Sequence, residues 1–251
     1  MIPKIIHYCW LSGDPYPEKI QNCIDSWKKI LPDYEIKLWN MNNFDINSID
    51  FVKEACSVKK WAFASDYIRL YALYNYGGIY LDSDVLIKKN LDKLLENNFF
   101  SAVEYHPDCV EQNKTLLLLN EDGSSKNFGE RKPGIGIQAA VIGSIAKHQF
   151  LKDAMEWYNK NHFILCDGSY NNVFIAPDVL AMCAEKYGFK YKNEEQKLKE
   201  GMLILPSNII AGDYRFDIND SNIALHLTLH SWNPRKKTLL HKVTKFLRKF
   251  L

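Results

Sequence analysis

The chain has 251 residues, of which 47% are hydrophobic and 25% are charged. These values are typical of one soluble globular domain with its own core, and they exclude collagen, disordered and disulfide-scaffold proteins. The net charge of +2 hides an asymmetry, because residues 235–251 contain seven Lys or Arg and no acidic residue. The rest of the chain is therefore mildly acidic, which argues against a broad nucleic-acid-binding surface.

The cysteines and the N-terminus bear on the cellular compartment. The N-terminus lacks the pattern of a signal peptide, and no stretch of the sequence is apolar for long enough to cross a membrane, so we expect neither feature. The cysteines contain no C-x-x-C pair, which fits neither a zinc site nor a secreted disulfide framework. We therefore expect free thiols in a reducing cytoplasm at Cys9, Cys23, Cys56, Cys109, Cys166 and Cys183.

The first segments of the chain alternate between strand and helix patterns. Residues 2–10 and 34–39 are rich in β-branched and aromatic residues and predict strands. Between them, residues 17–30 have apolar residues at the three-to-four spacing of a helix. This order predicts an α/β domain with a mostly parallel central sheet. The longest predicted helix spans residues 59–76, and Gly-Gly ends it before a strand at 79–81.

The second half of the chain has weaker patterns. Residues 105–136 are polar and contain several glycines, which predicts a long loop that is either functional or mobile. Helical patterns return at 147–160 and 177–187, and strand patterns follow at 204–205 and 223–229. We expect one domain over residues 1–234.

An aspartate pair follows the predicted strand at 79–81. Asp82 and Asp84 are separated by one residue, so side chains at a strand end would point to the same face. Two such carboxylates suit Mg²⁺ or Mn²⁺, which keep coordination positions open for phosphate oxygens. A bare D-x-D arises by chance in a chain this rich in aspartate. Its setting after Gly-Gly and an apolar strand is what favours a metal site.

A second polar pair lies on the 59–76 helix. Asp66 and Arg69 are three residues apart and therefore neighbours on one face. An ordinary surface ion pair is one interpretation, and it would contribute little. The apolar residues around the pair favour a buried position instead, where a carboxylate and a guanidinium could bind sugar hydroxyls and phosphate.

Three strings of the sequence resemble glycosyltransferase family 32: IPKIIHYCWLSG, WAFASDYIRLYALYNYGGIYLDSDV and HSW. The middle string also resembles the catalytic domain of the large clostridial glucosylating toxins. The resemblance is strong over residues 1–95 and loose over 130–232. It implies the GT-A nucleotide-sugar-binding fold and a reaction that retains the anomeric configuration.

The resemblance also implies residue roles. Trp10 would stack on the base of the donor, and a Ser-Trp element at Ser231 and Trp232 would close over its diphosphate. Ser65, Asp66 and Arg69 would contact ribose, sugar and phosphate. The full set of implied donor-binding residues is Trp10, Ser65, Asp66, Arg69, Tyr80, Asp82, Ser231 and Trp232.

The implied metal ligands come from two parts of the chain. Asp84 would bind Mn²⁺ or Mg²⁺ directly, and Asp82 would reach the ion through water. His226 is the candidate third ligand, since neutral imidazole also binds Mn²⁺. His230 is the alternative.

The sequence departs from the family between residues 130 and 138. Many relatives have an asparagine there, whereas this chain offers Gln138 as a substitute. The choice between a front-face mechanism and a covalent intermediate therefore stays open. The catalytic set predicted from the sequence is Asp82, Asp84, Arg69 and Gln138.

These observations predict a metal-dependent hexosyltransferase with a nucleotide-sugar donor, UDP-galactose or UDP-glucose being favoured and GDP-mannose left open. The expected acceptor is a surface glycan such as a capsule polysaccharide, free or lipid-linked. The alternatives are a toxin-like protein glucosyltransferase, a metal-dependent phosphohydrolase and a non-catalytic glycan-binding module. The phosphohydrolase would leave Trp10 and the Ser-Trp element without a purpose.

Residues 235–251 form a separate element in this interpretation. Their apolar residues recur at helical spacing with Lys and Arg between them, which predicts a basic amphipathic helix on the anionic inner face of the cell membrane. The alternative is that the apolar stripe packs on the protein itself or on a second subunit.

Overall fold

The computed structural model describes residues 1–211 and 219–229. Its helices are α1 Glu18–Ile30, α2 Asp50–Ser57, α3 Trp61–Tyr76, α4 Pro107–Gln112, α5 Gln149–Lys160 and α6 Ala176–Ala184, with short 3₁₀ turns at Ile46–Ser48, Asp92–Glu96, Thr115–Leu118, Glu185–Tyr187 and Lys199–Gly201. Its strands are β1 Ile5–Cys9, β2 Glu35–Trp39, β3 Gly78–Leu81, β4 Val85–Ile87, β5 Phe99–Tyr105, β6 Ile135–Ile137, β7 Val141–Ser144, β8 Gln196–Leu198, β9 Met202–Leu205, β10 Ile210–Ala211 and β11 Ala224–His226.

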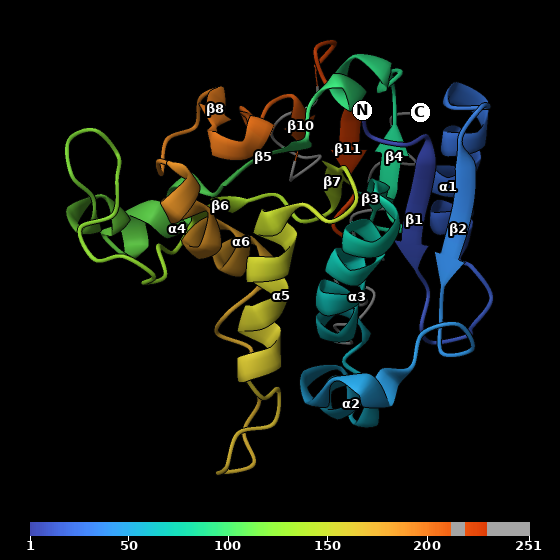
Figure 1. The fold of residues 1–251 in the computed structure, drawn as a ribbon, viewed down its shortest axis with the longest axis horizontal. Helices are drawn as coiled ribbons and strands as arrows, with labels where there is room; N and C mark the ends of the chain where they lie inside the picture. The colour runs from blue at the N-terminus through green and yellow to red at the C-terminus, as the bar shows by residue number, and fades with distance from the viewer. Residues whose placement is uncertain (212–218, 230–251) are drawn as a thin grey trace, which may run out of the picture.

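A mixed sheet of eight strands forms the centre of the molecule (Figure 1). The strand order is β2-β1-β3-β7-β5-β9-β8, with β6 paired to β5. Strands β2, β1, β3, β5 and β9 run in one direction, while β7, β6 and β8 run against them. The predicted α/β fold with a mostly parallel sheet is therefore confirmed. A smaller sheet, β10-β11-β4, lies beside it.

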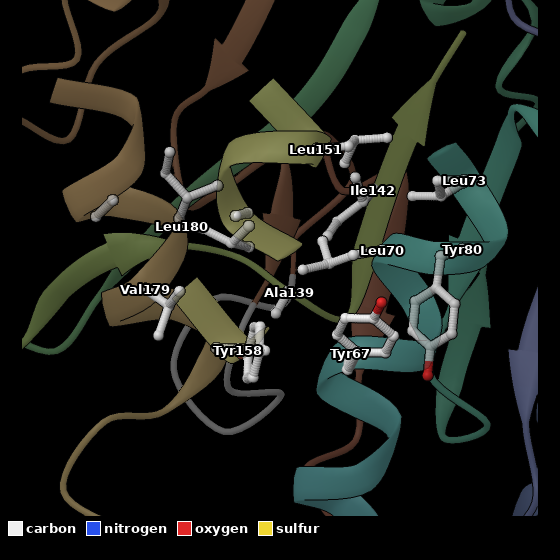
Figure 2. Close-up of a cluster of buried hydrophobic side chains, with 14 of the residues drawn as sticks. Tyr67, Leu70, Leu73, Tyr80, Ala139, Ile142, Leu151, Tyr158, Val179 and Leu180 are labelled. Carbon is white, nitrogen blue, oxygen red and sulfur yellow. The ribbon is translucent and has the colours of Figure 1, made fainter. Parts of the chain in front are cut away.

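Side-chain alternation along the strands separates two cores. On β3, Tyr80 belongs to the core beneath α3, α5 and α6, whereas Ile79 and Leu81 belong to the core on the side of α1. On β5, Phe99 and Phe100 divide in the same way. Successive strand residues point to opposite faces, so a fully buried strand must be apolar on both. Figure 2 shows the first core, where side chains of α3, α5, α6 and β7 meet.

The Gly-Gly pair lets β3 lie against β1. Gly77 has a φ of 65°, and a Cβ on Gly78 would lie 2.5 Å from the carbonyl oxygen of Ile5. His7 on β1 is fully buried, and its Nδ1 accepts a hydrogen bond from Trp39 Nε1 at 3.1 Å. Its Nε2 therefore carries the proton and donates to the Gly77 carbonyl at 2.8 Å. These contacts fix the strand that leads into the aspartate pair.

The structure differs from the sequence prediction chiefly in the second half. The segment 105–136, predicted as one long loop, contains α4, a 3₁₀ turn and the start of β6. The strand patterns also failed to predict β5 and β7, because both faces of these strands are buried and period-two alternation is absent. All six cysteines are free, as expected. Within the described residues, no helix is long and apolar enough to span a bilayer.

Candidate functional site

A pocket of about 870 Å³ opens where β1, β3 and β5 end. Parallel strands present their carboxyl ends at one edge of the sheet, and in open α/β sheets this edge is the usual ligand site. Residues that follow these strands line the pocket, as do the first turns of α3, the connection between β6 and β7, and β11. Of the residues predicted to bind the donor or metal, the structure brings together Trp10, Ser65, Asp66, Arg69, Tyr80, Asp82, Asp84, Gln138 and His226.

The aspartate pair sits in a turn between β3 and β4. The Val85 amide donates to the Asp82 carbonyl at 2.9 Å, which closes the turn. The pairing of β11 with β4 places His226 opposite Val85, and His226 Nε2 lies 3.2 Å from Asp84 Oδ1. One ligand atom each from Asp82, Asp84 and His226 lie within 4.8 Å of one another. Two carboxylates and an imidazole at this spacing fit a divalent cation such as Mn²⁺ or Mg²⁺.

The charges of this group are mutually dependent. Burial lowers the pKa of His226, but the carboxylates of Asp84 and Asp82 outweigh burial and raise the pKa to about 9. Burial raises the pKa of Asp84, and the His226 imidazolium together with the Leu229 amide, which donates to Asp84 Oδ2 at 2.9 Å, holds that pKa below its usual value. The proton on His226 thus partly neutralises the two carboxylates. A bound cation would do the same and would replace that proton.

Arg69 connects α3 to the aspartate turn. Its Nη2 donates to Asp66 Oδ1 at 2.7 Å, its Nη1 donates to the Ala139 carbonyl at 2.6 Å, and the same Nη1 lies 3.5 Å from Asp82 Oδ1. The guanidinium also lies over the Tyr80 ring, at 4.8 Å from its centroid. Both members of the Asp66–Arg69 pair are buried, which rules out the surface ion pair.

Burial also changes the acidity of Asp66 in this network. Burial raises the pKa of Asp66 to about 7, although the Arg69 guanidinium opposes this shift. Tyr80 donates its hydroxyl proton to Asp82 Oδ1 at 2.9 Å, which orients that carboxylate. The network therefore holds Asp82 from two sides, by Tyr80 and by Arg69.

Trp10 and Ser65 lie at the same pocket. Trp10 follows β1, and its Nε1 donates to the Asp14 carbonyl at 2.7 Å while its ring meets the Tyr16 ring edge to face. These contacts hold the indole plane in place at the pocket wall. Ser65 donates its hydroxyl proton to the Ala62 carbonyl at 2.8 Å, within the first turn of α3.

Gln138 has an unusual amide group. The side chain is 1% exposed, and its Oε1 accepts a hydrogen bond from the Ala140 amide at 3.0 Å. Its Nε2 has no hydrogen-bond partner within the described residues. A buried amide donor without a partner is costly, and this one belongs to a residue that lines the pocket.

Sequence reasoning missed a carboxylate in the pocket wall. Glu104 near the end of β5 lines the pocket and pairs with His106 Nε2 at 3.0 Å. The only signal would have been its place near the end of a parallel strand, and β5 itself was not predicted. Ser231, Trp232 and the alternative ligand His230 lie outside the described residues.

Comparisons of the sequence with known proteins find glycosyltransferases. Residues 17–101 match the family described as glycosyltransferase sugar-binding region containing DXD motif. Inositol phosphoceramide mannosyltransferase 3 of Schizosaccharomyces pombe is 39% identical over 38% of this chain and 27% of its own length. Mannosyl phosphorylinositol ceramide synthase CSH1 of Saccharomyces cerevisiae is 36% identical over 65% of this chain and 38% of its own length. The chain thus spans less than half of these relatives.

A solved structure shares the fold. The structure described as PaToxG glycosyltransferase has a TM-score of 0.50 and 18% identity, and the match covers 74% of this chain and 69% of that one. This likeness is one of fold. The resemblance to DXD glycosyltransferases that the sequence motifs indicate is supported by the family match over residues 17–101.

Proposed function

We propose that this chain, which matches the DXD-containing sugar-binding region of glycosyltransferases over residues 17–101, transfers a hexose from a nucleotide sugar to a glycan acceptor and retains its anomeric configuration. The observation that carries the proposal is the grouping of Asp82, Asp84 and His226 at the carboxyl-end pocket of the sheet. A divalent ion bound there would neutralise the charge that grows on the departing diphosphate. Mn²⁺ is the first candidate and Mg²⁺ the second.

The chain's own residues would hold the donor around that site. Trp10 offers an aromatic face for the base, and Ser65 and Asp66 offer oxygen acceptors for ribose and sugar hydroxyls. Arg69 is occupied by Asp66 and the Ala139 carbonyl, so in this proposal it positions the two aspartates and adds positive charge near the phosphates. Tyr80 orients Asp82.

Gln138 is the proposed group beside the anomeric carbon. Its unpartnered Nε2 would donate to a sugar or phosphate oxygen and gain the hydrogen bond that the free protein lacks. A neutral amide is a poor nucleophile, which favours front-face transfer over a covalent intermediate. In this proposal, Ser231 and Trp232 close over the diphosphate.

The donor sugar and acceptor are the least constrained parts. The names of the yeast relatives describe mannosyl transfer to inositol phosphoceramide, which moves mannose ahead of galactose and glucose. We keep GDP-mannose, UDP-galactose and UDP-glucose as candidates. The proposed acceptor is a lipid-linked glycan, as in surface polysaccharide assembly, at the cytoplasmic face of a membrane to which residues 235–251 attach the protein.

The decisive experiment is donor turnover by the full chain with each of these three nucleotide sugars, with Mn²⁺ and with EDTA. Asp84→Asn should lower turnover at least about 100-fold, because the amide keeps the shape and loses the charge that holds the ion. Asp25→Asn, an exposed change on α1, is the matched control and should have no effect. Full turnover in EDTA, or a normal rate in Asp84→Asn, would remove the proposal.

The products separate the remaining alternatives. A transferase releases the nucleoside diphosphate, whereas a phosphohydrolase releases sugar phosphate and nucleoside monophosphate. Proton NMR of the new linkage should show the anomeric configuration of the donor. Inversion would contradict the retaining mechanism.

A further inference from the structure

The loop between α5 and α6 exposes apolar side chains, and two of them line the pocket. This segment, residues 161–175, is the 161–175 loop. It exposes Leu165, Tyr170, Val173 and Ile175, and the exposed fraction of Val173 is 58%. Tyr170 and Ile175 also line the pocket. Figure 1 shows this loop projecting beyond α5, at the same end of the molecule as α2. Large exposed apolar patches mark binding surfaces, so four exposed apolar residues on one projecting loop make it a candidate for such a surface.

The loop is held in place at its base. Glu54 of α2 accepts hydrogen bonds from the Phe163 and Ile164 amides at 2.7 and 2.9 Å, and its other oxygen binds His162 Nδ1 at 2.7 Å. The Phe163 ring is buried and stacks on the Tyr170 ring, with centroids 5.4 Å apart. The exposed apolar residues therefore extend from a fixed base.

Two lysines share the rim with the loop. Lys59 has a left-handed backbone with a φ of 56°, which turns the chain sharply before α3, and both Lys59 and Lys60 line the pocket. Lys60 Nζ lies 5.9 Å from the centroid of the Tyr170 ring. Neither lysine forms an ion pair with any described residue. Their charges are thus available to an anion that reaches the mouth of the pocket.

We propose that the 161–175 loop, together with Lys59 and Lys60, is the entrance for a membrane-anchored acceptor that carries phosphate beside its sugar. Leu165, Val173 and Ile175 enter the interfacial layer of the bilayer, and the lysines pair with headgroup phosphate. The proposal rests on the proposed transferase function, because it assigns the pocket mouth to the acceptor.

The combination of chemistry favours a phospholipid over a soluble glycan. A free oligosaccharide is bound by aromatic and polar groups and gains nothing from exposed aliphatic side chains outside the pocket. A phospholipid headgroup brings an apolar layer and an anionic layer together, in the same order as the apolar loop and the lysines of the rim. The exposed residues Leu116, Leu117 and Phe128 form another apolar surface, but they line no part of this pocket and serve as a control.

The test measures co-sedimentation of the full chain with phosphatidylcholine vesicles, with and without phosphatidylinositol. Leu165→Ser/Val173→Ser should lower the partition coefficient about tenfold on both vesicle types, because two inserted aliphatic side chains are removed. Leu116→Ser/Leu117→Ser is the matched control and should bind like the unchanged protein. The melting temperature of each variant checks that the fold is intact.

The charge component has its own pair of variants. Lys59→Ala/Lys60→Ala should weaken binding about fivefold per lysine, and only where phosphatidylinositol is present. Lys197→Ala/Lys199→Ala changes the same charge near β8, at the opposite end of the molecule in Figure 1, and should leave binding unchanged.

Several results would overturn the proposal: no vesicle binding by the unchanged chain, equal binding by the loop variant, or loss of self-association in that variant without loss of vesicle binding. The last result would identify an interface between copies. Residues 235–251 lie outside the described residues. Their proposed attachment would add to the binding free energy independently, so it would not mask the loop effect. No nucleotide sugar is present in the assay, so failure of the transferase proposal and failure of this one are distinguishable.

Discussion

The helix-and-strand layer around β1, β3 and α3 differs from the loops of the second half in what it exposes. In the first, His7, Asp66 and Arg69 are buried, although each carries a polar group. In the second, residues 113–131 and 161–175 contain most of the large hydrophobic side chains that the described part of the chain leaves exposed. One region buries polar groups, and the other exposes apolar ones.

In the proposed function, the buried region and the 161–175 loop, which both line the pocket, have different roles. Metal and donor chemistry needs atoms held to a fraction of an ångström, which buried hydrogen-bond networks on helices and strands supply. Recognition of a large acceptor needs accessible surface, which loops supply. Substitutions should therefore affect stability strongly in the first region and weakly in the second.

The sharpest test of this comparison is Arg69→Met against Arg131→Met. Loss of Arg69 leaves the Asp66 carboxylate and the Ala139 carbonyl buried without their partner, and should lower the free energy of unfolding by about 4 kcal/mol. Arg131 also pairs with a buried aspartate, Asp178, at 2.7 Å, but its side chain is 31% exposed, so water replaces part of the lost contact. Arg131→Met should therefore lower the free energy of unfolding by only about 1 kcal/mol.

Urea unfolding of both variants checks the difference. Asp66→Asn/Arg69→Met should regain part of the stability that Arg69→Met loses, because no buried charge remains unpaired. Equal losses in Arg69→Met and Arg131→Met would contradict the comparison.

The pH dependence of stability should also differ between the regions. Burial lowers the pKa of His7 to about 4, against the effect of its hydrogen bond to Gly77. Between pH 6.5 and 4, His7 is therefore protonated in the unfolded chain but not in the folded one. The free energy of unfolding falls as pH falls, by about 3 kcal/mol in total. His7→Gln keeps a donor for the Gly77 carbonyl and should remove this dependence.

His162 of the 161–175 loop provides the opposite case. Its hydrogen bond to Glu54 raises its pKa, so its contribution is present at low pH and is lost as pH rises through the folded-state pKa. It is exposed, so His162→Gln should change the pH profile only slightly. Thermal unfolding across pH 4 to 8 measures both variants, and an unchanged profile in His7→Gln would refute the assignment.

The smallest expected effect compares two glycines with positive φ. Gly78→Ala brings a Cβ to 2.5 Å from the Ile5 carbonyl oxygen, whereas a Cβ at Gly168, in the 161–175 loop, meets nothing within 4 Å. Backbone strain alone should cost about 1 kcal/mol at Gly168. The steric clash should make the loss of stability in Gly78→Ala about 2 kcal/mol larger than the loss in Gly168→Ala. Melting temperatures of the two variants give the difference, and equal values would mean that β1 and β3 separate easily.

Several elements were predictable because their signals are local. The helix predicted over 59–76 is α3, and its bounds agree with the prediction to within two residues. The Gly-Gly ends it as predicted, and the strand that leads into the aspartate pair is β3. The burial of Asp66 and Arg69 follows from the apolar residues beside them on the same helix. By contrast, β5 and β7 are buried on both faces and α4 has only six residues, so none of them has the periodicity on which prediction depends.

The sequence by itself determined the order of strands and helices at the start of the chain, the position of the aspartate pair, and the oxygen ligands of the proposed cation. Only the tertiary structure decided which residues join that pair. His226 reaches Asp84 because β11 pairs with β4, Gln138 enters the pocket wall beside β5 because its backbone amide donates to the Ala102 carbonyl, and the 161–175 loop reaches the mouth because Glu54 holds its base. Such contacts join distant parts of the chain, whereas hydrophobic periodicity reports only which face of one element is buried.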